Sequence, residues 1–315
     1  PLANNLVPIR FKLKKQKKFP LIFGKCNRCD HFQLKNLVSP SKMFNNYLYV
    51  SSASKTLKKH LYSISTIVNR CKKLEKKDLV VDIGSNDGTL LKGYKRLNVR
   101  TVGFEPARNL SKFYKNSNIN LVSNYFNIKT AQQVKKKHGL AKVITATNVF
   151  PHLQNLSDFA KSLKILMAKD GIFVLEAHYL KNLLNDCAFD TIYHEHTSYW
   201  SVSAVKKFCE INDLNLFKVE KLGIHHGQIR CWISRKNIMK IDKNLKRILK
   251  SENIENITSK KYLIKFKNKI NNNKKKLFSL MNKIQRSGQE LIGYGAPAKA
   301  TTLLCFFGIK KNKLK

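Results

Sequence analysis

The sequence predicts an α/β fold, a doubly wound parallel sheet with helices on both faces. Two observations favour it. Leu79, Val80 and Val81 are apolar β-formers that lead into a glycine-punctuated turn and a helix-compatible stretch. Similar apolar runs recur along the 315 residues, with helical patterns between them. The sequence contains no run of about 18 apolar residues, so we expect no transmembrane helix.

The turn at residues 82–88 is the first place where a ligand can approach the backbone. Gly84 and Gly88 permit backbone angles that other residues avoid. Their spacing from Asp82 differs from the dinucleotide fingerprint Gly-x-Gly-x-x-Gly. It looks like the first motif of S-adenosylmethionine (SAM) methyltransferases, although any α/β strand-to-helix turn is the simpler interpretation.

Later strands end in polar residues. Arg100–Phe104 reads as the second strand, and Glu105 at its tip can accept two hydrogen bonds from a ribose diol. Val143–Ala146 precedes Asn148, and a further strand ends in Glu176. Because ligands of doubly wound sheets bind at the carboxyl ends of the strands, these side chains are predicted to share one edge.

The N-terminal part carries a cysteine pair and two tyrosines. The seven cysteines are scattered, and only Cys26 and Cys29 are close, which favours a reducing, cytoplasmic setting over a disulfide framework. Two thiolates at this spacing can share a zinc ion, but a structural site needs four ligands. The pair is therefore half a zinc site or two free thiols. Tyr47 and Tyr49 either reach into the active cleft or pack against it.

The segment 189–199, FDTIYHEHTSY, has the richest chemistry. A histidine that titrates near neutrality can take a proton from carbon next to a carbonyl, while a phenol or carboxylate tunes the enolate. His194 and His196 also have a spacing that could bind metal. A polar turn with satisfied histidines is the plain alternative. His152 follows the fourth strand, near the expected position of the SAM sulfonium.

The C-terminal half predicts an extension of the sheet and a second βα unit. Leu214–Val219 and Gln228–Ser234 read as antiparallel strands, with Arg230 able to meet a phosphate. Residues 240–286 are predicted to be helical. Glu290–Lys299 reads as a strand, a glycine turn and the start of a helix, where backbone N–H groups and Lys299 favour an anion.

The formal net charge of +42 comes almost entirely from lysines spread along the chain. A surface that reads nucleic acid typically has clustered arginines with interleaved aromatic residues. The even spread, with abundant Asn and Ile, is typical of coding bias. We therefore expect no specific nucleic-acid partner, only weak and salt-sensitive binding to polyanions.

Together these segments resemble the SAM-dependent sugar C-methyltransferases, which make branched deoxysugars on nucleoside-diphosphate carriers. The resemblance is carried by Cys26-x-x-Cys29, the segment 47–52, VDIGSNDGTLL, GFEP, NVFPH, FDTIYHEHTSY, HHGQIR and GYGAPAKATTLL. It implies a remnant of a zinc-binding module with its linker (1–54), a Rossmann-like SAM methyltransferase domain (55–238) and an incomplete C-terminal Rossmann-like domain (239–315). SAM is the implied cofactor, and any zinc is structural.

The resemblance also implies roles for single residues. His196 would remove the proton alpha to a keto group, Tyr193 and Glu195 would position the sugar and steady the enolate, and His152 would assist. SAM would be held by Asp82, Gly84, Asn86, Gly88, Glu105 and Asn148. The nucleotide sugar would be contacted by Tyr47, Tyr49, His226, Arg230, Tyr294 and Lys299.

The chain departs from the family pattern in places. The first cysteine pair is missing, and family members normally continue well past residue 315, so both ends are expected to be truncated. Gln228 stands where the family has a Gly-Ser-type sequence, and Ala300 and Thr301 replace a Gly-Asn pair. A SAM methyltransferase with a small-metabolite or RNA acceptor, or a SAM-binding protein without turnover, remains an alternative.

Overall fold

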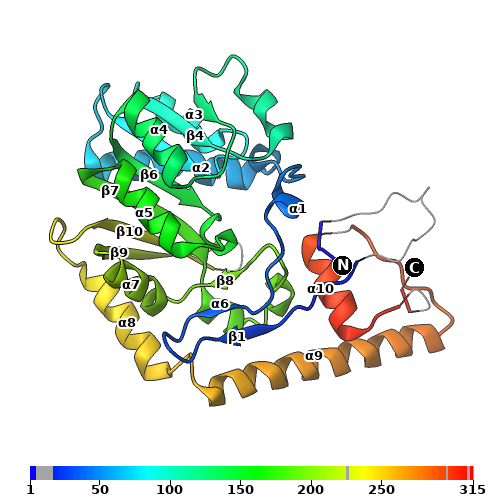
Figure 1. Cartoon of the computed structure of the whole chain (residues 1–315). Helices are drawn as coiled ribbons and strands as arrows, with labels where there is room; N and C mark the ends of the chain where they lie inside the picture. The colour runs from blue at the N-terminus through cyan, green and yellow to red at the C-terminus, as the bar shows by residue number, and fades with distance from the viewer. Residues whose placement is uncertain (5–16, 225–226, 296, 311–312, 315) are drawn as a thin grey trace.

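A seven-stranded sheet forms the centre of the protein, whose computed structural model describes residues 1–4, 17–224, 227–295, 297–310 and 313–314. The strand order is β5-β4-β3-β6-β7-β10-β9, in which the first five strands run parallel and the last two antiparallel (Figure 1). The strands are β3 (Leu79–Ile83), β4 (Arg100–Phe104), β5 (Asn120–Val122), β6 (Ala141–Thr147), β7 (Met167–His178), β9 (Leu214–Leu222) and β10 (Gln228–Arg235). This confirms the predicted doubly wound sheet and its antiparallel extension.

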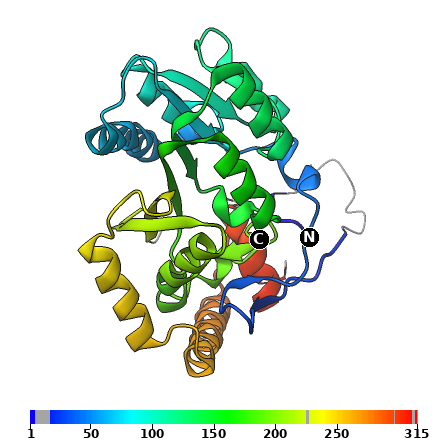
Figure 2. The same ribbon diagram turned by 60° about the vertical axis from the view of Figure 1, so that its left-hand side comes forward.

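Helices cover both faces of the sheet, and every residue of the inner strand β3 is therefore buried (Figure 2). One face packs against α2 (Lys55–Lys72) and α3 (Thr89–Lys95). The other packs against α4 (Ile128–His138), α5 (Leu156–Leu166), α7 (Val202–Ile211) and α8 (Lys243–Glu255). One apolar core on each face of the sheet holds its carboxyl edge in place.

A small second sheet joins the N-terminal part to the histidine-rich segment. The hairpin of β1 (Phe23–Lys25) and β2 (Phe32–Leu34) pairs antiparallel with β8 (Ser198–Tyr199). The remaining elements of this part are two short helices and four 3-10 turns. They are α1 (Ser41–Phe44), α6 (Leu180–Asn185), η1 (Ser51–Ala53), η2 (Arg108–Tyr114), η3 (Phe150–His152) and η4 (Phe189–Thr191). Sequence reasoning did not foresee this pairing, because two- and three-residue strands carry almost no periodicity.

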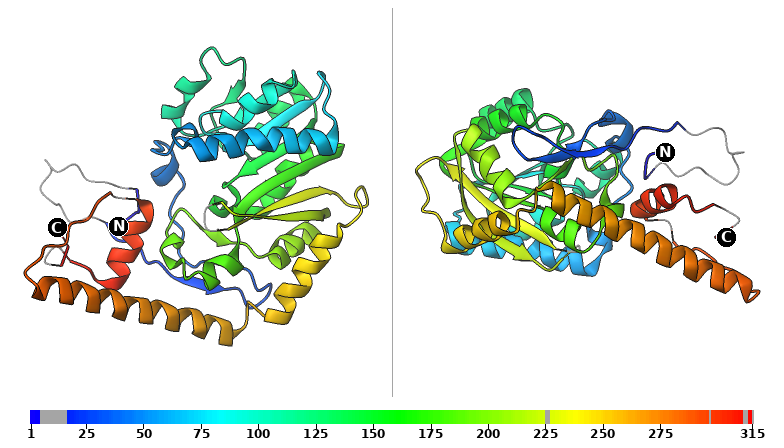
Figure 3. Two further views of the ribbon diagram at one scale, coloured as in Figure 1. Left: turned by 180° about the vertical axis from the view of Figure 1, so that it is seen from behind. Right: turned by 90° about the horizontal axis from the view of Figure 1, so that it is seen from below.

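The C-terminal part is mostly helical. The long helix α9 (Lys260–Arg286) extends away from the sheet, and α10 (Ala298–Phe307) lies beside it (Figure 3). The helix expected near residue 299 is confirmed, but the strand expected before it is not: residues 290–295 form no strand. No described strand lies beside this segment to pair with it, so its backbone has no ladder to join.

The helices of the described residues are all too short or too polar to span a bilayer.

Candidate active site

The glycine turn after β3 has the backbone geometry that its sequence predicts. Gly84, Asn86 and Gly88 have φ values of 64°, 52° and 73°, in the left-handed region. A Cβ atom at Gly84 would stand 2.3 Å from Cγ2 of Val149, so this position accepts only glycine without rearrangement. The turn brings main-chain atoms to the carboxyl edge of the sheet, where a ligand can reach them.

Glu105 at the tip of β4 is held against this turn. Its Oε2 accepts the backbone N–H of Asn86 at 2.9 Å, and its Oε1 accepts that of Ala107 at 2.8 Å. Burial raises the pKa of Glu105, and these two hydrogen bonds oppose the rise. A carboxylate has about four acceptor sites, so a ribose diol can still be bound. The turn and Glu105 together therefore fit SAM.

Asp82 is engaged differently from the expected contact with the cofactor. It lies at the end of β3, is buried, and accepts a hydrogen bond of 2.6 Å from Oγ1 of Thr145 on β6. Burial raises the pKa of Asp82 to about 7. Its carboxyl group therefore ties two neighbouring strands together beneath the turn.

Asn86 uses its side chain to hold a preceding segment, residues 47–52, which we call the strap. Its Oδ1 accepts the backbone N–H of Ser51 at 2.8 Å, and its Nδ2 donates to the carbonyl of Tyr49 at 3.0 Å. The Asn86 carboxamide therefore holds the strap, and the contact of Asn86 with SAM stays a prediction. The backbone of this residue remains part of the turn.

Two more polar side chains fasten the strap. Asp87 Oδ2 accepts the backbone N–H of Ser52 at 2.9 Å. Asn109 bonds both the N–H and the carbonyl of Tyr47, at 3.0 and 2.8 Å. Sequence reasoning did not select Asp87, although a second acid inside the glycine turn was a visible signal. The strap therefore lies directly against the expected SAM site.

The histidine-rich segment forms a turn rather than an extended strand, since the N–H of His196 donates to the carbonyl of Tyr193 at 2.9 Å. The turn brings several rings together. The His196 ring lies 4.3 Å from that of Tyr193, 5.2 Å from that of His152 and 5.3 Å from that of His178, centroid to centroid. His178 was not foreseen, although it ends the same strand that carries Glu176.

His196 is held as a neutral imidazole, with a pKa below the near-neutral value that the sequence analysis expected. Its Nδ1 donates to the carbonyl of Thr191 at 2.8 Å, because a carbonyl can only accept, and the lone pair is therefore on Nε2. Burial, together with the neighbouring His152 and His178, holds the pKa of His196 well below its usual value. The imidazole is neutral at physiological pH, which is the form of a general base.

His152 links the two sides of the site. Its Nδ1 donates to the carbonyl of Glu195 at 2.7 Å. Burial lowers the pKa of His152, while the carbonyls of Glu195 and Asn148 oppose this. Asn148 follows β6 with a φ of 58°, so His152 connects the sheet edge to the histidine-rich turn.

Tyr47 of the strap lies between the glycine turn and the histidine-rich turn. Burial raises the pKa of its phenol, and the nearby Glu195, Tyr193 and Glu105 add to the rise. Burial likewise raises the pKa of Tyr193 and of Glu195. Tyr47 and Tyr193 thus keep their protons and act as hydrogen-bond donors. Tyr49, by contrast, is exposed and lies nearer Asp87.

Comparison with known proteins decides the class of enzyme. Residues 57–219, just over half of the chain, match the methyltransferase domain family. The chain belongs to this family. Residues 223–315 match the C-terminal domain of C-methyltransferases. The protein is a SAM-dependent methyltransferase.

One curated relative spans the whole chain. The C-methyltransferase NovU of Streptomyces niveus is 27% identical over 316 residues, which cover 100% of this chain and 75% of NovU. A solved SAM-dependent methyltransferase of Anabaena variabilis is 14% identical with a TM-score of 0.43, covering 64% of this chain and 100% of its own. The precorrin-6y C5,15-methyltransferase of Geobacter metallireducens is 14% identical with a TM-score of 0.40, covering 61% and 94%. Both scores are low, so neither structure bears on the site or the substrate.

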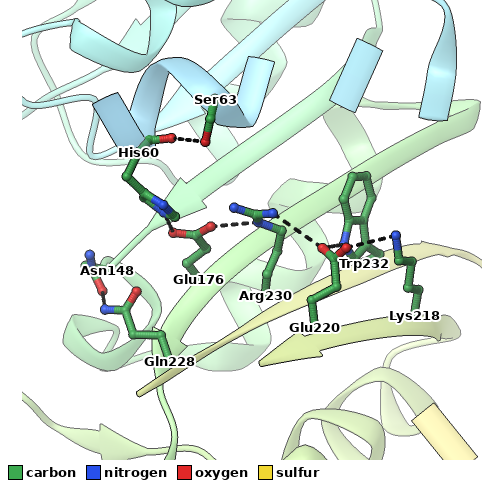
Figure 4. Close-up of polar contacts among 9 residues, drawn as sticks. All are labelled: His60, Ser63, Asn148, Glu176, Lys218, Glu220, Gln228, Arg230 and Trp232. Atoms are coloured by element: carbon green, nitrogen blue, oxygen red, sulfur yellow. Dashed lines mark hydrogen bonds and ion pairs between the residues drawn. The ribbon is translucent and has the colours of Figure 1, made fainter. Parts of the chain in front are cut away.

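Arg230 of the methyltransferase is engaged by carboxylates, in contrast to the phosphate contact expected from the sequence. Its Nε donates to Glu176 at 2.7 Å, and its NH1 lies 3.4 Å from Glu220 (Figure 4). Glu176 also contacts His60 of α2 at 2.7 Å, and Glu220 accepts the indole N–H of Trp232. Adjacent strands place these side chains opposite each other, so the buried guanidinium pairs within the sheet.

The other predicted substrate contacts have different positions. Lys299 at the start of α10 lies close enough for its charge to lower the pKa of His196. Thr302 of the same helix donates to the carbonyl of Ile192 at 3.0 Å, which docks α10 on the histidine-rich turn. Tyr294 is fully exposed, away from these groups. His226 lies outside the described residues.

Cys26 and Cys29 lie at the turn of the N-terminal hairpin. The backbone N–H groups of Arg28 and Cys29 lower the pKa of Cys26, while burial raises that of Cys29. Within the described part of the chain, no group of three or more His, Cys, Asp or Glu side chains could hold a metal ion. A cavity of about 440 Å³ adjoins the hairpin and is lined by Lys25, His31 and Leu153 among others, but not by the glycine turn.

Proposed function

We propose that the enzyme methylates a carbon atom of a keto-deoxysugar nucleotide, by removing a proton alpha to the keto group and transferring a methyl group to that carbon. The observation that carries this proposal is His196, a neutral imidazole whose ring lies 4.3 Å from that of Tyr193 and whose Nδ1 donates to the carbonyl of Thr191. The C-methyltransferase match and NovU support attack by carbon. A carbon nucleophile needs such a base, because an alpha proton is not lost unaided.

Each side chain then has a role. His196 takes the proton at Nε2, and Thr191 holds its ring in the required tautomer. The phenols of Tyr47 and Tyr193 can donate to the oxygen on which enolate charge develops. SAM, when bound at the glycine turn and Glu105, supplies the electrophilic methyl group. Lys299 on α10 is available for the diphosphate.

The test is turnover with methyl-labelled SAM and a panel of keto-deoxysugar nucleotides. NMR of the product locates the labelled methyl group. We expect label on the carbon next to the keto group. With S-adenosylhomocysteine in place of SAM, the wild type should exchange that carbon's proton with deuterated solvent. His196→Ala should slow this exchange by about 10²-fold or more, while its affinity for SAM stays within about threefold.

His138→Ala is the matched control. His138 ends α4 just before β6 begins, at the edge of the sheet opposite the carboxyl ends of the strands. It should exchange and turn over like the wild type. Exchange that survives in His196→Ala would exclude His196 as the base. Label found only on oxygen or nitrogen would overturn carbon methylation.

We also propose the domain division inferred from the sequence. Residues 55–238 would form the SAM unit and 239–315 the start of a second unit that closes over the sugar nucleotide. The two family matches, over 57–219 and 223–315, support a boundary in this region. Limited proteolysis with and without the sugar nucleotide tests it, because a closing unit should become protected at residues 287–295.

We propose further that Cys26 and Cys29 supply half of a structural zinc site. The lowered pKa of Cys26 favours the thiolate that zinc requires. Because zinc takes no part in the proton transfer at His196, we expect methyl transfer to persist after treatment with EDTA. Activity that is lost on chelation and restored by zinc alone would contradict a purely structural role.

A further inference from the structure

Gln228 occupies a buried position at the same sheet edge as the candidate active site. It is the first residue of β10 and is only 1% exposed. Its register partner on β7 is His178, whose ring lies 5.3 Å from that of His196. Gln228 is therefore next to the group that we expect to remove the proton.

Its carboxamide is satisfied at one end only. The Nε2 atom donates to Oδ1 of Asn148 at 2.5 Å, and the oxygen Oε1 turns away from Asn148 (Figure 4). Oε1 is buried and has no hydrogen-bond partner among the residues that the structure describes. Leaving a buried acceptor unpaired costs about 1–3 kcal/mol. Other buried polar atoms of the described chain are also unpaired, but Oε1 of Gln228 lies at the edge of the candidate active site, where a bound ligand can supply the missing donor.

The position of Gln228 identifies which ligand this is. SAM is expected over the turn after β3 and Glu105 on β4, whereas β10 lies three strands away from β3 in the sheet. At a strand spacing of about 4.8 Å, this separation is roughly 14 Å. Asn148, between the two, follows β6 in a left-handed conformation that is uncommon for a non-glycine residue. Asn148 is itself a residue that the sequence assigns to SAM, and β10 lies on the side of β6 away from β3, so the donor that Oε1 lacks is assigned to the methyl acceptor.

We propose that Oε1 of Gln228 accepts a hydrogen bond from a hydroxyl or amino group of the acceptor, on the atom next to the carbon that is methylated. Gln228 thereby selects acceptors that carry a donor at that position. This inference rests on the proposed function and adds a substituent requirement to it. A site built around a buried hydrogen bond rejects an analogue that lacks the partner, because the buried group is then left unpaired.

The experiment combines one side-chain change with one substituent change. Gln228→Met keeps the length of the side chain but removes the carboxamide. It is assayed with keto-deoxysugar nucleotides that carry a hydroxyl, an amino group or hydrogen next to the reacting carbon. For the wild type we expect kcat/KM to be about 100-fold higher with a donor than with hydrogen.

Gln228→Met should lose most of this preference by becoming slower with donor-bearing acceptors and not with the deoxy acceptor. Gln228→Glu, which keeps an acceptor oxygen, should retain the preference. The hydroxyl and amino arms show which donor is used. The affinity for SAM, measured separately by calorimetry, should be unchanged in both variants. Gln133→Met on the exposed surface of α4 is the control for the substitution itself.

Three results would overturn the inference. An equal loss with all acceptors would mean that Gln228 only positions Asn148. A weaker affinity for SAM without a change in preference would place the donor on the cofactor. A wild type that turns over these sugars without preferring a donor would remove the premise.

If Gln228→Met does not fold, Gln228→Ser takes its place in the same comparison. A wild type that methylates none of these sugars instead overturns the proposed function, and this inference with it.

Discussion

At the scale of single residues, burial and hydrogen bonding give the acidic side chains around the glycine turn different states. Asp82 is buried with one hydroxyl partner, and its pKa rises to about 7. Burial also acts to raise the pKa of Asp87, but hydrogen bonds from Ser52 and Thr89 outweigh it, and the net shift is downward. Asp87 is therefore the anion of the turn, and Asp82 is a carboxyl group that loses its proton only near neutrality.

Asp82 should make the unliganded enzyme less stable as pH rises. Its folded pKa of about 7 lies above the usual 3.8, so the folded state binds more protons between these values and stability falls from pH 4 to pH 7. The stability of Asp82→Asn relative to the wild type should be higher at pH 8 than at pH 5, by on the order of 2 kcal/mol. Urea unfolding at both pH values measures this.

The control is Asp213→Asn, which changes an exposed residue that already has a positive φ. It should show no such pH-dependent gain. A gain of Asp82→Asn that is equal at pH 5 and pH 8 would contradict the titration of Asp82.

Arg230 should matter for stability rather than for substrate binding. Arg230→Met leaves the buried Glu176 without its cation, and breaking such a pair costs about 3–5 kcal/mol. Arg230→Met/Glu176→Gln should recover part of the loss. Urea unfolding and acceptor KM are measured together. If Arg230→Met kept the stability of the wild type but had a higher acceptor KM, the phosphate contact predicted from the sequence would be supported instead.

At the scale of elements, the strap joins the two halves of the site. Its backbone is fastened to Asn86 and Asp87 on one side and to Asn109 on the other. It carries Tyr47 to the space between Glu105 and Glu195. A segment held by a few hydrogen bonds, rather than by an apolar core, can open at low cost. We expect SAM to enter and leave as the strap opens.

Asn109→Ala should loosen the strap without touching the cofactor, because Asn109 lies on η2 and bonds only the backbone of Tyr47 there. We expect SAM to dissociate several-fold faster, since removing two partly exposed hydrogen bonds shifts opening by about 1 kcal/mol. Hydrogen exchange of residues 47–52 and stopped-flow release of SAM measure this. Ser111→Ala on the same turn is the control, and faster exchange without faster release would separate the strap from cofactor entry.

At the scale of the whole molecule, distant parts of the chain converge on the histidine-rich turn. The N-terminal hairpin pairs with β8 just after the turn, and α10 packs against η4 just before it, with the rings of Phe189 and Phe307 5.1 Å apart. The site is thus enclosed by both ends of the described chain. The chain also carries a formal net charge of +42, which the proposed reaction does not use.

That charge should produce polyanion binding that is unrelated to catalysis. We expect RNA oligonucleotides to bind at low salt without sequence preference, and the affinity to fall about 10³-fold between roughly 50 and 200 mM salt. Fluorescence anisotropy over a salt series measures this, with the sugar nucleotide as competitor. Binding that is sequence-selective and persists at high salt would favour the alternative of an RNA acceptor.

The sequence by itself determined the strands, the glycine turn and the class of chemistry. Strand periodicity, the glycines at 84 and 88 and the His-Glu-His run are local signals, and local backbone preference survives in the fold. The wrongly predicted strand at 290–293 shows the limit, because a strand exists only where a neighbour pairs with it. Its apolar residues were visible in the sequence, whereas the missing neighbour was not.

Only the tertiary structure decided which side chains meet. Gln228 and Asn148 are 80 residues apart in sequence, and Arg230 and Glu176 are 54 apart. Their contacts follow from the order of strands in the sheet, which no single segment encodes. The same packing gives Asp82, Asn86 and Arg230 contacts within the protein that their positions in the sequence did not reveal. Burial, a property of the whole fold, gave His196 the neutral form that the proposed reaction requires.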